Sequence, residues 1–169
     1  MQRILVIGNA GAGKTTFAKQ LAQKLQLPLI HLDSIFWCGN WEHLSQYEFD
    51  TILQSNLEQP RWIIDGNFNR TIPRRLQYCD TVFYLDFPTL TCLVGITKRT
   101  LANLGRSRTD MGGNCTERFD SHKIPLYRHV LSFNSQHRAD YYRMLGNAKD
   151  VNVVVFKNRS QANAFLNKL

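Results

Sequence analysis

Short hydrophobic runs alternate along the chain with stretches in which apolar residues recur at helical spacing. Each run is continuously apolar rather than alternating, which is typical of strands covered on both faces, as in a parallel sheet. Five such runs predict strands at Arg3–Gly8, Pro28–Asp33, Arg61–Gly66, Thr81–Phe87 and Val151–Phe156.

Helical patterns fill the intervals between these runs. Apolar residues four positions apart predict a helix over Thr15–Leu27. Ser45 and Glu48 have the spacing of a capping box, which predicts a helix from there to about Leu57. Three more helices are expected: one from Pro88 to a stop at Gly105, one from about Ser121 towards Leu145, and a short one capped by Ser160.

The succession of strands and helices predicts a doubly wound or related α/β sandwich. A length of 169 residues fits one domain, and no repeat, low-complexity segment or linker divides it. No apolar run approaches the roughly 20 residues that cross a membrane. The first run ends at Gly8, too early for a signal peptide. We therefore expect a single domain over residues 1–169 with no membrane partner.

The turn between the first strand and the first helix carries the strongest chemical signal. It reads Gly8-Asn9-Ala10-Gly11-Ala12-Gly13-Lys14-Thr15 and matches G-x-x-x-x-G-K-[ST], the P-loop or Walker A pattern. Its glycines let backbone N–H groups approach phosphate oxygens, and the helix adds the positive end of its dipole. These eight residues and Thr16 are candidates for binding ATP, with Lys14 at the β and γ phosphates and the Thr15 hydroxyl on Mg²⁺.

Acidic residues end three of the predicted strands, at the edge where open α/β sheets bind ligands. Asp65 closes an apolar strand in the Walker B pattern and is expected to hold Mg²⁺, directly or through water. Asp33 is expected either to orient or deprotonate an acceptor hydroxyl or to cap the next helix, and both roles stay open. Asp86 is expected to be a structural cap before Pro88.

Basic residues surround the break at Gly105. They are Lys98, Arg99, Arg106, Arg108 and Arg118. Arginines on a moving segment can stabilise a transferring phosphoryl group while closure excludes water, and a solvated basic face is the alternative. We expect a short lid at about 105–120, with Arg106 and Arg108 catalytic at the γ-phosphate and Arg99 holding the nucleotide.

The phosphoryl acceptor is expected to bind after the second strand, at about 34–60. Trp37, beside Phe36 and Trp41, is a candidate to stack on a base or sugar, although these rings can equally pack against each other. The three arginines that follow Asp65, which are Arg70, Arg74 and Arg75, are candidates for holding the acceptor. The histidines, among them His31, His129 and His137, lack metal-ligand spacing and are expected to be structural.

The chain carries 21 Lys and Arg against 13 Asp and Glu, a net charge of +8. Such an excess favours a polyanionic partner, which can be a nucleotide, a nucleic acid or an acidic metabolite. The cysteines, Cys38, Cys79, Cys92 and Cys115, lie far apart with no CxxC pair. They indicate reduced thiols and a cytoplasmic location.

Several segments, taken in order, carry a family resemblance. They are Gly8–Thr15, His31–Asp33, Trp62–Arg70, Leu85–Pro88, Gly105–Met111 and Glu117–Asp120. Together they resemble the bacterial adenylate-kinase-related proteins known as DNA topology modulation proteins. The resemblance covers essentially the whole chain. It implies a three-layer P-loop sandwich like that of nucleoside monophosphate kinases, with a five-stranded parallel sheet and a short arginine lid.

Two details of that resemblance concern the acceptor. Asp65, Gly66 and Arg70 resemble the Asp-Gly-Phe-Pro-Arg stretch of adenylate kinases, whose Asp serves the Mg²⁺ site and whose Arg holds the acceptor phosphate. Here the stretch has no proline and its arginine comes one residue later. Asp33 is similar to the substrate-binding Asp of shikimate- and gluconate-type kinases, which implies a hydroxyl acceptor.

These observations predict a phosphotransferase that moves the γ-phosphate of ATP·Mg²⁺ to a small-molecule or nucleotide acceptor by in-line transfer. Two alternatives stay open. One is a nucleotide-dependent regulator of topology that binds DNA, which the positive charge favours. The other is a domain that binds ATP without transferring phosphate.

Overall fold

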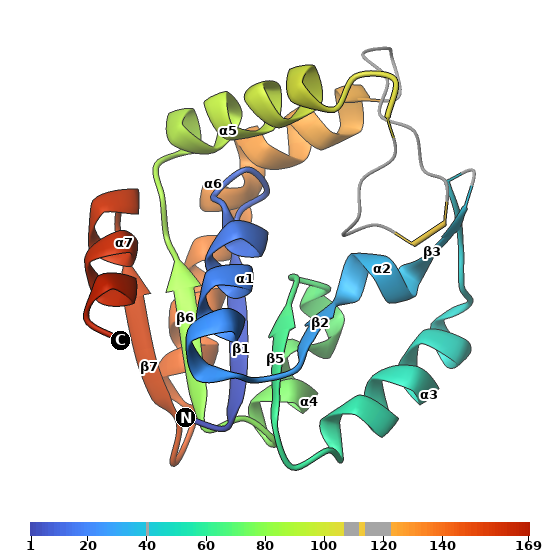
Figure 1. The fold of residues 1–169 in the computed structure, drawn as a ribbon. Coiled ribbons are helices and arrows are strands. Elements are labelled where there is room, and N and C mark those ends of the chain that lie inside the picture. Colours follow the sequence, from blue (N-terminus) through green and yellow to red (C-terminus); the bar gives the residue numbers. More distant parts are fainter. Residues whose placement is uncertain (40, 107–111, 114–122) are drawn as a thin grey trace.

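Five parallel strands form the central sheet of the protein (Figure 1). The computed structural model describes residues 1–39, 41–106, 112–113 and 123–169. The strands lie in the order β2-β5-β1-β6-β7, so β1 has a neighbour on each side. Their bounds are β1 (Arg3–Gly8), β2 (Leu29–His31), β5 (Trp62–Asp65), β6 (Thr81–Leu85) and β7 (Asn152–Phe156). All five predicted strands are confirmed, and the second is shorter than expected because the chain turns into a helix at Leu32.

Five longer helices connect or flank these strands, and each was predicted. They are α1 (Lys14–Leu25), α3 (Gln46–Leu57), α5 (Thr89–Ala102), α6 (Ile124–Gly146) and α7 (Arg159–Asn167). The Ser45–Glu48 capping box at the start of α3 is present in both directions. The predicted cap of the last helix is wrong by two residues, because the side chain of Asn158, not Ser160, accepts the Gln161 N–H.

Short elements were not predicted. They are α2 (Leu32–Phe36), the hairpin of β3 (Trp37–Gly39) and β4 (Glu42–His43), the 3₁₀ turn η1 (Asn69–Thr71) and α4 (Ile72–Leu76). None is longer than five residues. A segment of that length contains little more than one helical turn, so its apolar residues do not establish a period.

The two faces of the sheet are covered by different helices, and β1 shows the division. Ile4 and Val6 belong to a core that includes residues of α1 and α7. Leu5 and Ile7 belong to a second core with residues of α3, α4 and α6. Alternate residues of a strand face opposite ways, so a strand apolar throughout separates two hydrophobic layers. The protein is thus the three-layer α/β sandwich that was expected (Figure 1).

Two other expectations from the sequence concern membrane spans and the cysteines. Within the described residues, no helix is both long and apolar enough to cross a membrane. Cys38, Cys79 and Cys92 are free thiols, and Cys115 lies outside the described residues. Burial raises the pKa of Cys79 to about 12 and that of Cys92 to about 11, so both stay protonated at neutral pH.

Candidate nucleotide-binding and catalytic site

The P-loop connects the end of β1 to the start of α1 and packs tightly against its surroundings. Gly8, Gly11 and Gly13 all have positive φ, at 144°, 80° and 94°. A Cβ on Gly8 would collide with the carbonyl oxygen of Leu85 in β6, and one on Gly11 with that of Cys92 in α5. Packing therefore requires glycine at positions 8 and 11, whereas at Gly13, where a Cβ would meet nothing, only the positive φ favours it.

Hydrogen bonds that involve side chains hold the first two residues of the loop, Gly8 and Asn9, in place. The Gly8 N–H donates to Oδ1 of Asn67 at 3.1 Å. Asn9 is buried, and its Nδ2 donates to the Val130 carbonyl of α6 at 3.0 Å. Within the loop, the Ala12 N–H donates to the Asn9 carbonyl at 3.2 Å. The side chain of Asn9 thus points into the protein, which leaves its backbone as the group that can contact phosphate.

Lys14 is the first residue of α1, and its side chain is folded back over the loop. Its Nζ donates to the carbonyl oxygens of Gly8 at 2.9 Å and Asn9 at 3.2 Å. Burial lowers the pKa of Lys14, and the carboxylates of Asp65 and Asp33 oppose that shift. Both predicted carboxylates therefore act on this ammonium group, which places the three side chains around one site.

Thr15 and Asp65, the two predicted metal ligands, are in direct contact. The Thr15 hydroxyl donates to Oδ2 of Asp65 at 2.7 Å. Asp65 is only 5% exposed, yet its Oδ1 has no hydrogen-bond partner among the described residues. A buried carboxylate oxygen without a donor is costly, and Mg²⁺ takes oxygen ligands. This pair therefore fits a magnesium ion bound between the P-loop and the end of β5.

His31 belongs to the same group, which the sequence analysis missed. Its Nδ1 lies 3.1 Å from Oδ2 of Asp65. The parallel register pairs His31 of β2 with Asp65 of β5. A signal was present, because each residue lies within two positions of the end of a predicted strand. The sequence did not reveal that these two strands are neighbours.

A cavity of about 600 Å³ opens beside the P-loop. Its lining includes Gly11–Phe17, Lys19 and Gln20, together with Arg99 and Asn103 near the end of α5 and Arg159 and Asn163 of α7. Its size is that of a pocket for a nucleotide-sized ligand. The structure thus brings the candidates Thr16 and Arg99 to one pocket with the P-loop. Arg159, whose Nη2 lies 3.4 Å from the Gly11 carbonyl, was not predicted.

The acceptor candidates Asp33, Trp37 and Arg70 are not among the residues that line this cavity. Asp33 is not the last residue of a strand, as expected, but lies in the first turn of α2. Trp37 in β3 packs edge-on against Phe36, with ring centroids 5.1 Å apart, and against Trp41 at 5.4 Å. This aromatic packing is the alternative that the sequence left open for Trp37.

The arginines after Asp65 divide into exposed and buried. Arg70 makes a bidentate pair with Asp50 of α3, at 2.8 and 2.7 Å, and ties η1 to that helix. Arg74 is exposed. Arg75 is fully buried, with Nη1 donating to the Gly66 carbonyl at 2.9 Å and Nη2 to the Asn67 carbonyl. Burial removes Arg75 from any contact with an acceptor, so that expectation is wrong.

The predicted lid is described only at its start and at two glycines, Gly112 and Gly113. Gly105 has φ of 72°, and the exposed Arg106 donates its N–H to the Asn103 carbonyl at 2.9 Å. Arg108 and Arg118 lie outside the described residues.

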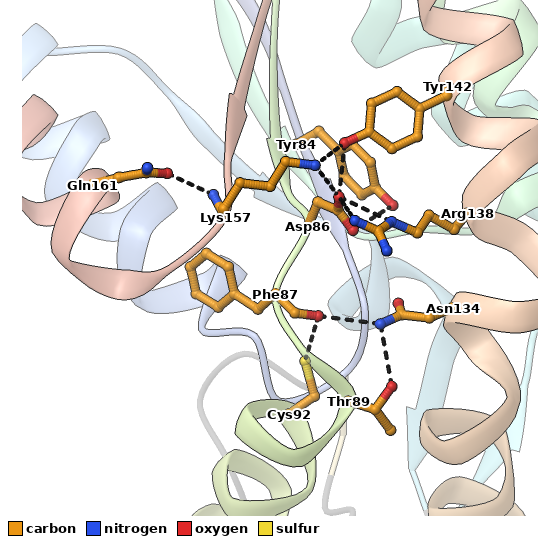
Figure 2. A network of polar contacts seen from close by, with 10 residues as sticks. All are labelled: Tyr84, Asp86, Phe87, Thr89, Cys92, Asn134, Arg138, Tyr142, Lys157 and Gln161. Atoms are coloured by element: carbon orange, nitrogen blue, oxygen red, sulfur yellow. Dashed lines mark hydrogen bonds and ion pairs between the residues drawn. The ribbon is translucent and has the colours of Figure 1, made fainter.

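Asp86 has a different role from the cap that the sequence predicted. The residue at the N-cap of α5 is Pro88. The Asp86 carboxylate instead accepts hydrogen bonds from Arg138 at 2.8 Å, Lys157 at 2.6 Å and Tyr142 at 2.7 Å (Figure 2). These contacts join the end of β6 to α6 and to the residue after β7, so Asp86 is a structural ion-pair centre.

Comparison with known proteins supports the fold. No protein-family model and no curated protein sequence matches this chain. Shikimate kinase from Bacteroides thetaiotaomicron is 18% identical, with a TM-score of 0.57 over 99% of this chain and 95% of its own. Shikimate kinase from Acinetobacter baumannii, in complex with shikimate, is 18% identical, with a TM-score of 0.59 over 99% and 90%. Deoxyadenosine kinase from M. mycoides is 16% identical, with a TM-score of 0.52 over 98% and 96%.

The chain therefore shares the three-layer α/β fold of these kinases. At these identities the likeness concerns the fold, and the reaction has to be argued from the site itself.

Proposed function

We propose that the protein is a P-loop phosphotransferase that moves the γ-phosphate of ATP to a hydroxyl group of a small-molecule or nucleotide acceptor. The observation that carries this proposal is the contact between Thr15 and Asp65 at 2.7 Å, beside a buried Asp65 oxygen to which no described residue donates. A P-loop followed by such a pair is suited to Mg²⁺ and phosphate together. We also propose the adenylate-kinase-related group that the motifs resemble as the family of the chain.

The residues of the site divide the work of binding ATP. The P-loop N–H groups and Lys14 bind the phosphates, and the cavity between α1, α5 and α7 takes the nucleoside part, with Arg99 and Thr16 at its wall. Thr15 and Asp65 hold the metal ion, which, when bound, neutralises charge on the β and γ phosphates. Arg106 and Arg108 complete the charge stabilisation from the lid.

Asp33 is the residue that we assign to the acceptor. Burial lowers the pKa of Lys14, and Asp33 lies close enough to that lysine to oppose the shift. Its carboxylate accepts the hydroxyl proton as the acceptor oxygen bonds to the γ-phosphorus, and the bond from that phosphorus to the β–γ bridging oxygen breaks to release ADP. Trp37 and the half-exposed Arg70 border the acceptor side.

The names of the structural neighbours agree with a hydroxyl acceptor. They are kinases of shikimate and of deoxyadenosine, and both of those molecules carry hydroxyl groups. This agreement supports the reaction class and leaves the particular acceptor to experiment.

The test is release of ADP from ATP·Mg²⁺ across nucleosides, nucleoside monophosphates, sugar acids and polyols. We expect one class to stimulate release, and Lys14→Ala to lower that rate by at least about 100-fold. Lys24→Ala is the matched control, because Lys24 is an exposed lysine of the same helix. A flat panel with ATP still bound would contradict transfer and favour an ATP-binding domain without it.

A further inference from the structure

Arg75 is a buried cation that the proposed reaction does not use directly. It lies in α4 with no exposed surface. Its guanidinium donates to two successive backbone carbonyls, those of Gly66 and Asn67. Those two residues immediately follow Asp65, so the fork of Arg75 holds the backbone that carries the metal-binding carboxylate.

The segment that Arg75 holds has an unusual backbone. Gly66 has φ of 135° and Phe68, which is not a glycine, has φ of 39°. Backbone in the left-handed region is maintained where surrounding contacts determine it. The two donors of Arg75 act on the carbonyls of this segment, and they thereby set the direction in which the chain leaves Asp65.

A second connection runs from Arg75 to the P-loop. Asn67, whose carbonyl accepts from Arg75, uses its side-chain Oδ1 to accept the Gly8 N–H at 3.1 Å. Gly8 is the first residue of the phosphate loop. One guanidinium is therefore linked to the site by two branches, through Gly66 to Asp65 and through Asn67 to Gly8.

Packing alone does not account for a charged group at this position. Among the described residues Arg75 makes no ion pair, and its buried Nε has no partner. Burial lowers its pKa to about 10, so the group is still charged at neutral pH. Burying an unpaired cation is costly, and an apolar side chain of similar volume would fill the same space more cheaply.

We propose that Arg75 is a positioning residue that sets both the metal-binding carboxylate Asp65 and the first amide of the P-loop. The inference rests on the proposed function, because it takes Mg²⁺ and nucleotide as the ligands. Residues that orient metal ligands through hydrogen bonds change metal affinity when they are replaced, although they do not touch the ion.

The test measures binding rather than turnover. Mn²⁺, detected by electron paramagnetic resonance, replaces Mg²⁺, and adenylyl imidodiphosphate replaces ATP. Arg75→Lys keeps the charge but removes the planar fork that reaches both carbonyls. We expect it to weaken Mn²⁺ binding in the nucleotide complex about tenfold. Arg74→Lys, at the exposed neighbour on the same helix, should bind as the wild type does.

A second variant separates the two branches and guards against misfolding. Asn67→Ala keeps Arg75 and removes only the acceptor of the Gly8 N–H. It should weaken nucleotide binding measured in EDTA, whereas Arg75→Lys should weaken metal binding as well. Thermal unfolding of each variant shows whether it is folded. If Arg75→Lys does not fold, Asn67→Ala is the variant used for the test.

The possible failures are distinguishable. If the wild type binds neither nucleotide nor Mn²⁺, the proposed function is overturned and this inference with it. If the wild type binds both and Arg75→Lys matches it in Mn²⁺ affinity, even with a lower melting temperature, Arg75 is merely structural and the inference alone is overturned. Wild-type nucleotide affinity in Asn67→Ala overturns the P-loop branch.

Discussion

Asp65 and Asp86 occupy equivalent places in the sheet and differ in what surrounds them. β5 and β6 flank β1 on opposite sides, and one acid ends β5 while the other follows β6. Both are nearly buried, at 5% and 4% exposure. Asp86 receives two cationic side chains and the hydroxyls of Tyr84 and Tyr142. Asp65 receives Thr15 and His31, and its Oδ1 has no donor in the part of the chain that the structure describes.

The difference teaches how to separate a structural carboxylate from a ligand-binding one. A buried carboxylate is stable when donors saturate it, as they do at Asp86 (Figure 2). One left partly unsaturated needs a further partner, and under the proposed function that partner is Mg²⁺. Both acids follow apolar strands, so the strand pattern alone does not distinguish them.

The largest effect is expected at Asp65. Asp65→Asn should weaken binding of Mg²⁺ with nucleotide by at least about tenfold and lower ADP release in proportion. Its thermal stability should be unchanged or higher, because the substitution removes a buried charge whose sole ion-pair partner in the described residues is His31. Calorimetric titration measures the binding of Mg²⁺ and nucleotide, and thermal unfolding measures the stability. Loss of stability without loss of metal affinity would make Asp65 like Asp86.

Asp86→Asn should show the reverse, a loss of stability with nucleotide binding retained. Removing the carboxylate leaves Arg138 and Lys157 without their ion-pair partner. Since both are half-exposed, we expect the free energy of unfolding to fall by about 2 kcal/mol rather than by the larger cost of a fully buried pair. In a chain of this size, that lowers the melting temperature by about 4–8 °C.

The Asp86 effect should also depend on pH. Burial would raise the pKa of Asp86, but hydrogen bonds from Lys157, Tyr142 and Arg138 outweigh it and lower the pKa below its ordinary value of 3.8. A carboxyl whose pKa is lower in the folded state stabilises the fold at pH values above its pKa in the unfolded state. That stabilisation is lost as the pH falls through its pKa in the folded state. The difference between wild type and Asp86→Asn should therefore be full at neutral pH and shrink below about pH 4. A constant difference in unfolding experiments across that range would refute the assignment.

Tyr142→Phe should produce the smallest change. It removes one donor to Asp86, at 2.7 Å, and leaves Arg138 and Lys157 in place. We expect a loss of about 1 kcal/mol in denaturant unfolding. The double variant with Asp86→Asn should lose less stability than the sum of the two single losses, because the residues are in contact. Full additivity would show that Tyr142 acts independently of Asp86.

Sequence reasoning succeeded where one local pattern determines one structure. The continuous apolar runs predicted all five strands of the sheet, and the P-loop pattern predicted the turn from β1 into α1 that carries Lys14 and Thr15. Asp65 was singled out because an acid at the end of an apolar strand lies at the ligand edge of a parallel sheet, and its metal-binding role stays a prediction.

The rest depended on contacts between distant segments. His31 reaches Asp65 because β2 and β5 are neighbours, an order that local patterns do not specify. Arg70 and Arg75 lie five residues apart, and the sequence analysis predicted the same role for both. In the structure Arg75 is buried, whereas Arg70 lies on the surface and pairs with Asp50. For Arg108, the lid function remains a prediction.

The P-loop is fastened to both helices that border the predicted lid. Gly11 packs against the backbone of α5, and Asn9 holds the Val130 carbonyl of α6. The connection between these helices, residues 103–123, therefore begins and ends at helices that contact the P-loop. A change in the length of this connection or in its arginines would leave the P-loop attached to both helices.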